Sequence, residues 1–255
     1  MERPKTSNLI DGNMTRGHSP VPLKVHVSRS DSQDETEFRV DRFTPMTVLD
    51  VLLTIQREHD ASIGFRFSCR VAMFGTCTIR VDGRSVLACQ SVVPPDTKTL
   101  HIGPLAGYSV IRDLVVDTTP FWDQWARVTP YFEPIDSLNE PALIKPDSDE
   151  RQAIDPALDC IQCGACFSSC GIAGVDRTFL GPAALNRALV LISDSRDAGD
   201  QHRLDLVTQV DGVDPKVTSD PGDRLTSLFD DPDRTFTELR IVLISLLRHL
   251  AIPYS

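Results

Sequence analysis

The alternation of apolar and polar residues begins at residue 21 and predicts a strand. In the stretch VPLKVHV, apolar positions alternate with polar ones, as in a strand with one buried face. A polar spacer, SRSDSQDETE, separates it from a second predicted strand over residues 38–43. Thr47 then precedes VLDVLLTIQREH, where apolar residues recur at helical spacing. This pattern predicts a helix over residues 48–59 that is capped by the Thr47 side chain.

Further short apolar runs follow this helix. They predict strands over residues 77–81, 86–88 and 99–102, with Asp82 and Gly83 forming a tight turn between the first two. A strand pair, one helix and further strands are the order of elements in a β-grasp domain. We therefore expect such a domain over residues 21–108.

The rest of the chain has a different pattern. Residues 1–20 are polar and rich in Gly and Pro, and we expect a flexible tail there. Residues 109–155 combine apolar, aromatic and Pro-rich stretches, so we expect a connector that packs on a partner or on both domains. From residue 156 to residue 255 the pattern is helical.

Two helices and one loop are predicted within residues 156–255, which we expect to form a second domain. PAALNRALVLISDSRD predicts a helix over residues 182–197 with Pro in its first turn. Residues 211–235 hold seven Asp and predict a solvated acidic loop. The final helix, over residues 235–250, is apolar on nearly all sides. Burial is the expected reason for that pattern, and attachment to a membrane surface is the alternative.

Composition narrows the function. The chain has 255 residues, 26 Lys and Arg against 36 Asp and Glu, and a net charge of −10, which argues against binding to nucleic acid. We find neither a secretory signal nor a run of about 20 apolar residues that could span a membrane. We therefore expect a cytoplasmic protein, where clustered cysteines are metal ligands or redox groups more often than disulfides.

The first cysteine group lies in FSCRVAMFGTCTIRVDGRSVLAC and comprises Cys69, Cys77 and Cys89. A plant-type [2Fe–2S] centre uses the spacing C-x₄-C-x₂-C with a distant fourth Cys. The spacing between the positions is intact here, but Phe74 stands at one of the ligand positions. A phenyl ring cannot donate an electron pair to iron as a thiolate does. Gly75 suits a loop that wraps closely around a cluster.

Three interpretations of Phe74 stay open at this point. A substitute ligand, such as water, a nearby oxygen donor or a residue of a partner, completes the cluster. Alternatively, the cluster forms only transiently. In the third interpretation the cluster is lost and Phe74 fills its cavity.

The second cysteine group is CIQCGACFSSC, which contains Cys160, Cys163, Cys166 and Cys170. The spacing C-x₂-C-x₂-C-x₃-C is specific for [4Fe–4S] ligation, and the fourth Cys of such runs normally serves another cluster. No Cys follows residue 170, so the fourth ligand of a [4Fe–4S] cluster has to come from elsewhere. Cys170 itself could be that ligand, a partner could supply it, or the site could be open or hold a three-iron cluster. A four-cysteine zinc site is the structural alternative.

These motifs resemble one known family, the iron–sulfur subunits of succinate dehydrogenases and fumarate reductases. The resemblance rests on TVLDVLL, FRFSCR, the Asp-Gly turn followed by VLAC, VIRDLVVD, CIQCGAC and FLGPAALNRALVLISDSRD. It implies an α+β protein with an N-terminal β-grasp [2Fe–2S] ferredoxin-like domain and a C-terminal α-helical ferredoxin-like domain.

The resemblance also implies cofactors and partners. Cys69, Cys77 and Cys89 match [2Fe–2S] ligands, with Phe74 at the missing position, and Cys160, Cys163 and Cys166 match [4Fe–4S] ligands. Cys170 matches a [3Fe–4S] ligand. The family's later cysteines are missing after residue 211, so we predict that a [3Fe–4S] cluster is absent. Partners would be an FAD-containing flavoprotein and a further electron-acceptor subunit, which would hold the protein at the inner face of the cell membrane.

Two functions follow from the resemblance. The first is a non-catalytic electron-transfer subunit that relays single electrons between a flavoprotein and an acceptor, while the substrate chemistry belongs to the partner. The second is a degenerate scaffold that keeps the docking fold with incomplete clusters or none. Phe74 and the missing downstream cysteines favour the scaffold, and seven cysteines at matching positions favour electron transfer.

Overall fold

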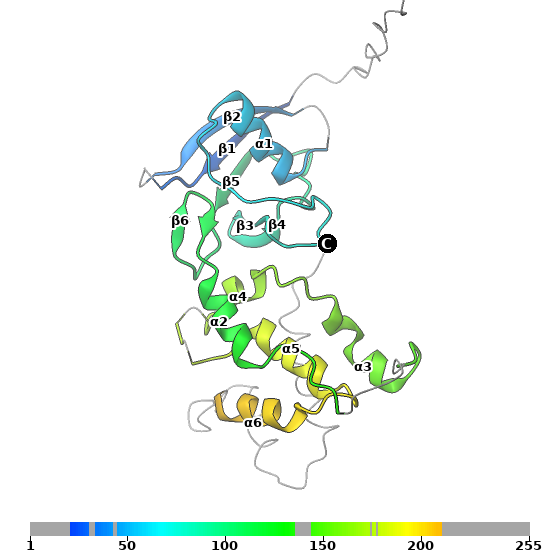
Figure 1. Cartoon of the computed structure of the whole chain (residues 1–255). Helices are drawn as coiled ribbons and strands as arrows, with labels where there is room; N and C mark the ends of the chain where they lie inside the picture. Colours follow the sequence, from blue (N-terminus) through cyan, green and yellow to red (C-terminus); the bar gives the residue numbers. More distant parts are fainter. Residues whose placement is uncertain are drawn as a thin grey trace, which may run out of the picture.

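The fold was analysed in a computed structural model, which describes residues 21–30, 34–42, 45–135, 144–173, 175–176 and 178–210. Within these residues a sheet with one long helix forms the upper part of the molecule in Figure 1, and the remaining helices lie below it. The α+β prediction is therefore confirmed. The predictions for residues 1–20, for the acidic loop over 211–235 and for the final helix fall outside the described residues.

The upper part is a β-grasp sheet. Its strand order is β2-β1-β5-β3-β4, with β1 and β5 parallel and the other neighbours antiparallel. Its elements are β1 (Val21–Val27), β2 (Thr36–Arg42), α1 (Val48–Glu58), β3 (Thr78–Val81), β4 (Arg84–Leu87) and β5 (Thr99–Gly103).

The alternation in β1 places one face of the strand in the core. Leu23, Val25 and Val27 are completely buried, and so are Val51 and Ile55 of α1. Burying such side chains contributes about 1.5–3 kcal/mol each. This apolar layer between sheet and helix fixes the register of the strands, since a slip by one residue would expose every core side chain.

The predicted cap of α1 is present. Thr47 Oγ1 accepts a hydrogen bond from the backbone N–H of Asp50 at 3.2 Å, and the Asp50 carboxylate accepts one from the backbone N–H of Thr47 at 2.9 Å. Two backbone donors at the helix start are thereby satisfied, which is the capping-box arrangement.

Two strand boundaries differ from the prediction. Strand β2 begins at Thr36, two residues before the predicted start, because its register with β1 continues to the pair Val27 and Thr36. Strand β4 begins at Arg84 because Asp82 and Gly83 are both left-handed, with φ of 47° and 83°, and complete the turn in two residues.

The connector contains regular structure that the sequence did not predict. A short hairpin, β6 (Val110–Arg112) and β7 (Val115–Val116), precedes α2 (Thr119–Arg127). Phe121 of α2 is buried and packs edge-on against Phe167, with ring centroids 6.3 Å apart. The aromatic residues of this stretch therefore form a core with the lower helices.

The lower helices are α3 (Asp149–Leu158), α4 (Ala165–Ser169), α5 (Pro182–Ile192) and α6 (Asp200–Val210). Helix α3 begins seven residues before the predicted start because Ser148 caps it. Helix α5 ends at Ile192 rather than at Asp197. The Asp194 carboxylate accepts hydrogen bonds from the backbone N–H and the guanidinium of Arg196, which stabilises a turn in place of helix.

A buried arginine of α6 joins the connector to the lower helices. Arg203 is completely buried and contacts the carboxylate of Asp197, while it also donates to the carbonyl oxygens of Val128, Thr129 and Tyr131. Such a charge is tolerated in the interior because every polar edge of the guanidinium has a partner. Among the residues described above, no helix is long and apolar enough to cross a bilayer.

Candidate iron–sulfur site

The first cysteine group lies at the edge of the sheet that faces the lower helices. Cys69 belongs to the loop before β3, Cys77 stands immediately before β3, and Cys89 follows β4. Cys77 and Cys89 are buried, and Cys69 is partly exposed. The antiparallel pairing of β3 and β4 brings the two buried thiols to the same place, because the backbone N–H of Ala88 donates to the carbonyl of Cys77 at 3.1 Å.

The loop between Cys69 and Cys77 turns tightly around the Cys69 sulfur. Arg70, Ala72 and Gly75 have φ of 60°, 57° and 66°, a left-handed conformation that aims successive backbone N–H groups inward. The Met73 N–H donates to Cys69 Sγ at 3.3 Å. This geometry is suited to holding a negatively charged sulfur.

The electrostatics agree with that geometry. The backbone amides of Val71, Met73 and Phe74 outweigh desolvation and hold the pKa of the Cys69 thiol below its ordinary value. At Cys77, burial together with the nearby Cys89 thiol raises the pKa to about 11. Binding of a metal centre would displace these thiol protons, because the thiolate is the ligand.

Phe74 lies mostly at the surface. It is 57% exposed, as are the neighbouring apolar residues Val71 and Met73 to a similar extent. A ring that plugged the space of a lost cluster would be buried, so this exposure argues against that interpretation.

The second cysteine group surrounds the start of α4. Cys160 and Cys163 lie in the loop before the helix, Cys166 is in its first turn, and Cys170 is its C-terminal cap. Gln162 and Gly164 are left-handed, with φ of 56° and 77°, so this loop also curls tightly.

The thiols of the second group are close enough to influence one another. Burial, followed by the Cys163 and Cys160 charges, raises the pKa of Cys166 to about 12. Burial and the charges of Cys166 and Cys163 also raise the pKa of Tyr108 above its usual range. Cys170 is one helical turn beyond Cys166, about 6 Å along the axis, and both pack on the same aromatic core.

A single zinc ion would need four of these sulfur atoms at about 2.3 Å from one point. Among the described residues, the group of three metal-ligating side chains that lies closest together contains no cysteine.

The two cysteine loops are in direct contact. A Cβ added to Gly75 would lie 2.6 Å from the Cα of Cys163, so the loops touch through backbone. Tyr108 donates to the carbonyl of Gly164 at 3.3 Å, and Ser85 of β4 donates to Ser168 of α4 at 3.2 Å.

A cavity of about 170 Å³ lies between the two loops. The two loops share its wall, with Phe74 and Gly75 on one side and Gln162 and Cys163 on the other. Trp122 of α2 also lines it.

The structure thus brings both predicted cysteine groups to one interface, which no pattern in the sequence indicates. Sequence reasoning did not identify Tyr108 or the contact between Gly75 and Cys163. The signal for this contact in the sequence is Gly75, but a glycine there is also explained by the tight turn of its own loop.

Comparison with known proteins gives the context of this site. The family model for the 2Fe-2S iron-sulfur cluster binding domain matches residues 24–123. The chain is 39% identical over 162 residues to the succinate dehydrogenase [ubiquinone] iron-sulfur subunit 1, mitochondrial, of Oryza sativa subsp. japonica, which covers 63% of this chain and 58% of that protein. It is 36% identical over 171 residues to the corresponding subunit of Candida glabrata, covering 66% of this chain and 67% of that protein.

These curated relatives are longer than the matched region. The chain spans between 53% and 67% of the length of four of them. Among solved structures, a chain of the Mycobacterium smegmatis Sdh1 complex in the apo form has the same fold, with a TM-score of 0.69 and 20% identity, over 93% of this chain and 100% of that one.

Proposed function

The chain belongs to the succinate dehydrogenase iron–sulfur subunit family, and we propose that it relays single electrons between a flavoprotein subunit and an acceptor. One observation carries this proposal. The Gly75 loop, which holds the first cysteine group, touches the Cys163 loop, which holds the second. Two redox centres in these loops would be neighbours, and a relay requires such an arrangement.

We propose two cofactors for these loops. Cys69, Cys77 and Cys89 would hold a [2Fe–2S] cluster, with a non-cysteine ligand in place of the missing fourth cysteine at position 74. The exposure of Phe74 and the lowered pKa of Cys69 support this assignment.

For the second group we propose a [4Fe–4S] cluster held by Cys160, Cys163, Cys166 and Cys170. The shared packing of Cys166 and Cys170 supports Cys170 as the fourth ligand. Residues 171–255 contain no cysteine, so we propose that they supply no ligands for a [3Fe–4S] cluster.

When bound, such clusters accept and give up one electron at a time. The residues of this chain set the conditions for that exchange. The amides of Val71 and Met73 stabilise sulfur charge, and the buried Phe121 and Phe167 exclude water beside the second group. Tyr108 donates a hydrogen bond to the backbone of the second loop. Dry surroundings and sulfur hydrogen bonds are the factors by which a protein sets a cluster potential.

The domain assignment is also part of the proposal. The [2Fe–2S] domain would comprise residues 21–108, the connector 109–155 and the [4Fe–4S] domain 156–255, with a tail over 1–20. The exposed apolar side chains of Phe67, Val71, Met73 and Phe74 around the first loop support docking of an FAD-containing flavoprotein there. A membrane would be reached only through partner subunits.

The degenerate scaffold is the second candidate function. Phe74, which cannot donate to iron, is the observation that favours it. It differs from the first candidate in one measurable property, because a scaffold would hold no acid-labile sulfide.

The test is to purify the full chain anaerobically, reconstitute it with iron and sulfide, and measure iron, sulfide and visible absorption before and after dithionite. We expect labile sulfide and an absorption band that dithionite bleaches. The variants Cys77→Ser and Cys163→Ser then assign the iron to the two loops, because each should remove the iron and sulfide of one cluster only. Absence of sulfide in the wild type would refute the relay and leave the scaffold, while zinc without sulfide would identify a zinc site.

A further inference from the structure

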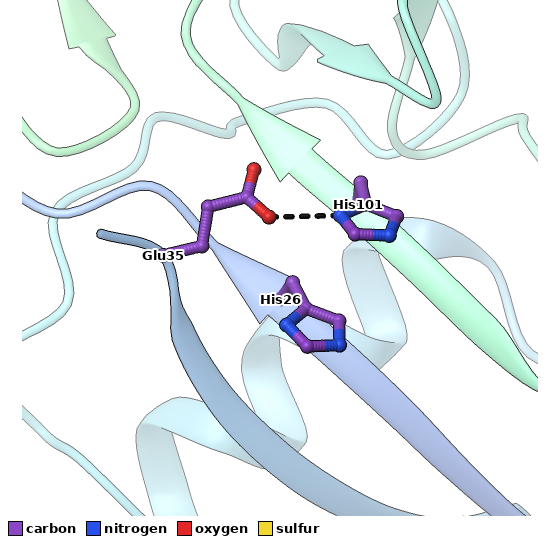
Figure 2. Close-up of side chains that lie close together, drawn as sticks. All are labelled: His26, Glu35 and His101. Carbon is purple, nitrogen blue, oxygen red and sulfur yellow. Dashed lines mark hydrogen bonds and ion pairs between the residues drawn. The ribbon is translucent and has the colours of Figure 1, made fainter.

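Two histidines and one glutamate form a cluster on the face of the β-grasp sheet opposite its core. His26 of β1 and His101 of β5 are direct partners in the parallel register of these strands. Their neighbours Val25, Val27 and Ile102 point into the core, so the alternation of the strands sends both histidines to the opposite face. Figure 2 shows the two imidazole rings side by side with the Glu35 carboxylate next to His101.

The three side chains are held close together. The imidazole rings are stacked, with centroids 4.7 Å apart and planes 11° from parallel. The Glu35 carboxylate lies 2.8 Å from His101 Nδ1, and one ligand atom from each of His26, Glu35 and His101 lies within 4.8 Å of the others. Glu37 places a second carboxylate oxygen 4.0 Å from His26 Nε2.

The backbone around this cluster is well fixed. The N–H of His101 donates to the Asp82 carboxylate at 2.9 Å, and both histidines belong to regular strands. A tetrahedral Zn–N distance of about 2.0–2.1 Å implies ligand atoms roughly 3.3 Å apart, so the three side chains would have to move closer together by rotating. Glu35 and His101 are exposed and free of core packing, and His26 is half-buried.

We propose that His26, His101 and Glu35 form a binding site for Zn²⁺ or a similar divalent transition metal, with water as the fourth ligand. Two imidazole nitrogens and one carboxylate oxygen are a ligand set that suits zinc, whereas Mg²⁺ and Ca²⁺ prefer oxygen ligands only. The second carboxylate, Glu37, adds negative charge beside the ion. The three ligands come from β1, β5 and the segment before β2, so a bound ion would link these three parts of the chain and stabilise the sheet.

The site is independent of the proposed electron relay. It lies on the polar face of the sheet, and it uses none of the seven cysteines. The zinc site can therefore be absent while the electron relay is present, and the relay can be absent while the zinc site is present.

The test measures Zn²⁺ bound to the full chain by equilibrium dialysis at pH 7.5, in the wild type and in the variants His101→Ala, His26→Ala and Glu35→Gln. Zinc that the cysteines bind cancels in the comparison, because all seven are unchanged in every variant. His202→Ala, which removes an exposed histidine of α6, is the matched control. Circular dichroism confirms that each variant is folded.

We expect the wild type and His202→Ala to bind one more equivalent of Zn²⁺ than His101→Ala and His26→Ala do. Glu35→Gln should weaken binding at this site by about tenfold or more. Zn²⁺ should also raise the thermal midpoint of the wild type more than that of His101→Ala, because an ion that binds only the folded state stabilises it, and Mg²⁺ should have no such effect. Equal zinc content in wild type and both histidine variants would overturn the proposal.

Discussion

Gly75 lies against the backbone of Cys163, so closely that no side chain fits between them. A Cβ at residue 75 would stand 2.6 Å from the Cα of Cys163 and 3.2 Å from its backbone nitrogen. Gly75 is also left-handed, with φ of 66°. The glycine therefore meets two requirements at once, the tight turn of the first cysteine loop and the approach of the second loop.

Replacing Gly75 by Ala should separate the two loops. The left-handed conformation alone costs an Ala about 1–2 kcal/mol, and the contact with Cys163 adds to that cost because backbone cannot move aside easily. Gly83→Ala is the matched control, since Gly83 has φ of 83° but nothing within 4 Å of an added Cβ. We expect urea unfolding to show a clearly larger loss for Gly75→Ala than for Gly83→Ala, and equal losses would contradict the close contact.

Introducing Cys at position 74 should strengthen cluster assembly in the first loop. Phe74→Cys completes the spacing C-x₄-C-x₂-C that begins at Cys69, and it replaces an exposed side chain, so the fold should be unaffected. After anaerobic reconstitution we expect more iron and labile sulfide per chain than in the wild type, and a more intense signal of a reduced [2Fe–2S] cluster by electron paramagnetic resonance.

The neighbouring variant Met73→Cys is the control for Phe74→Cys. Met73 is 63% exposed and is one residue out of register, so its thiol adds a cysteine without completing the spacing. If Met73→Cys gained as much iron and sulfide as Phe74→Cys, the register of the loop would have no role and the ligand assignment would fail.

Removing the buried carboxylate of Asp197 should destabilise the lower part of the molecule strongly. Asp197→Ala leaves the completely buried guanidinium of Arg203 without its main counter-charge, at a cost of about 3–5 kcal/mol. Asp155→Ala is the control, because its ion pair with Arg151 is exposed and should contribute at most about 1 kcal/mol. Chemical denaturation of the two variants compares these losses, and similar values would show that the buried pair is not needed.

The sequence predicted most of the β-grasp domain because its signals are local. Alternation in β1, the Thr47 cap and the Asp82-Gly83 turn each depend on residues a few positions apart. Helix α2 was missed because the aromatic Phe121 is explained only by Phe167, which lies far along the chain. The end of α5 was placed too late because the Asp194 turn competes with an apolar run that still appears helical.

The candidate site was predictable in its ligands but not in its assembly. Cysteine spacing identified both loops, yet the approach of Gly75 to Cys163 depends on how the sheet packs on the lower helices. The exposure of Phe74 likewise depends on the path of the loop backbone. The cluster of His26 with His101 required the parallel pairing of the first and last strands of the sheet, which no local pattern reveals.

The buried carboxylate of Asp113 should make the stability of the β-grasp domain depend on acid pH. Burial alone would raise its pKa, but hydrogen bonds from the backbone N–H groups of Ser30 and Gly64, at 3.0 Å and 2.7 Å, and the nearby Arg29 guanidinium outweigh burial and hold the pKa below its ordinary value. The folded state therefore favours the charged form. The resulting stabilisation is complete above the unfolded-state pKa of about 3.9 and is lost as the pH falls through the lower folded-state value.

Asp113→Asn should accordingly lower the free energy of unfolding by about 1–3 kcal/mol at pH 7. The difference from the wild type should stay constant down to about pH 5 and shrink as the pH falls below about 4, because the wild-type carboxyl then becomes neutral as well. Asp41→Asn, at an exposed position of β2, is the control and should show little difference at any pH. Urea titrations between pH 3 and pH 7 measure the difference in the free energy of unfolding between the wild type and Asp113→Asn. A difference that did not change with pH would mean that the charge of Asp113 does not contribute to stability.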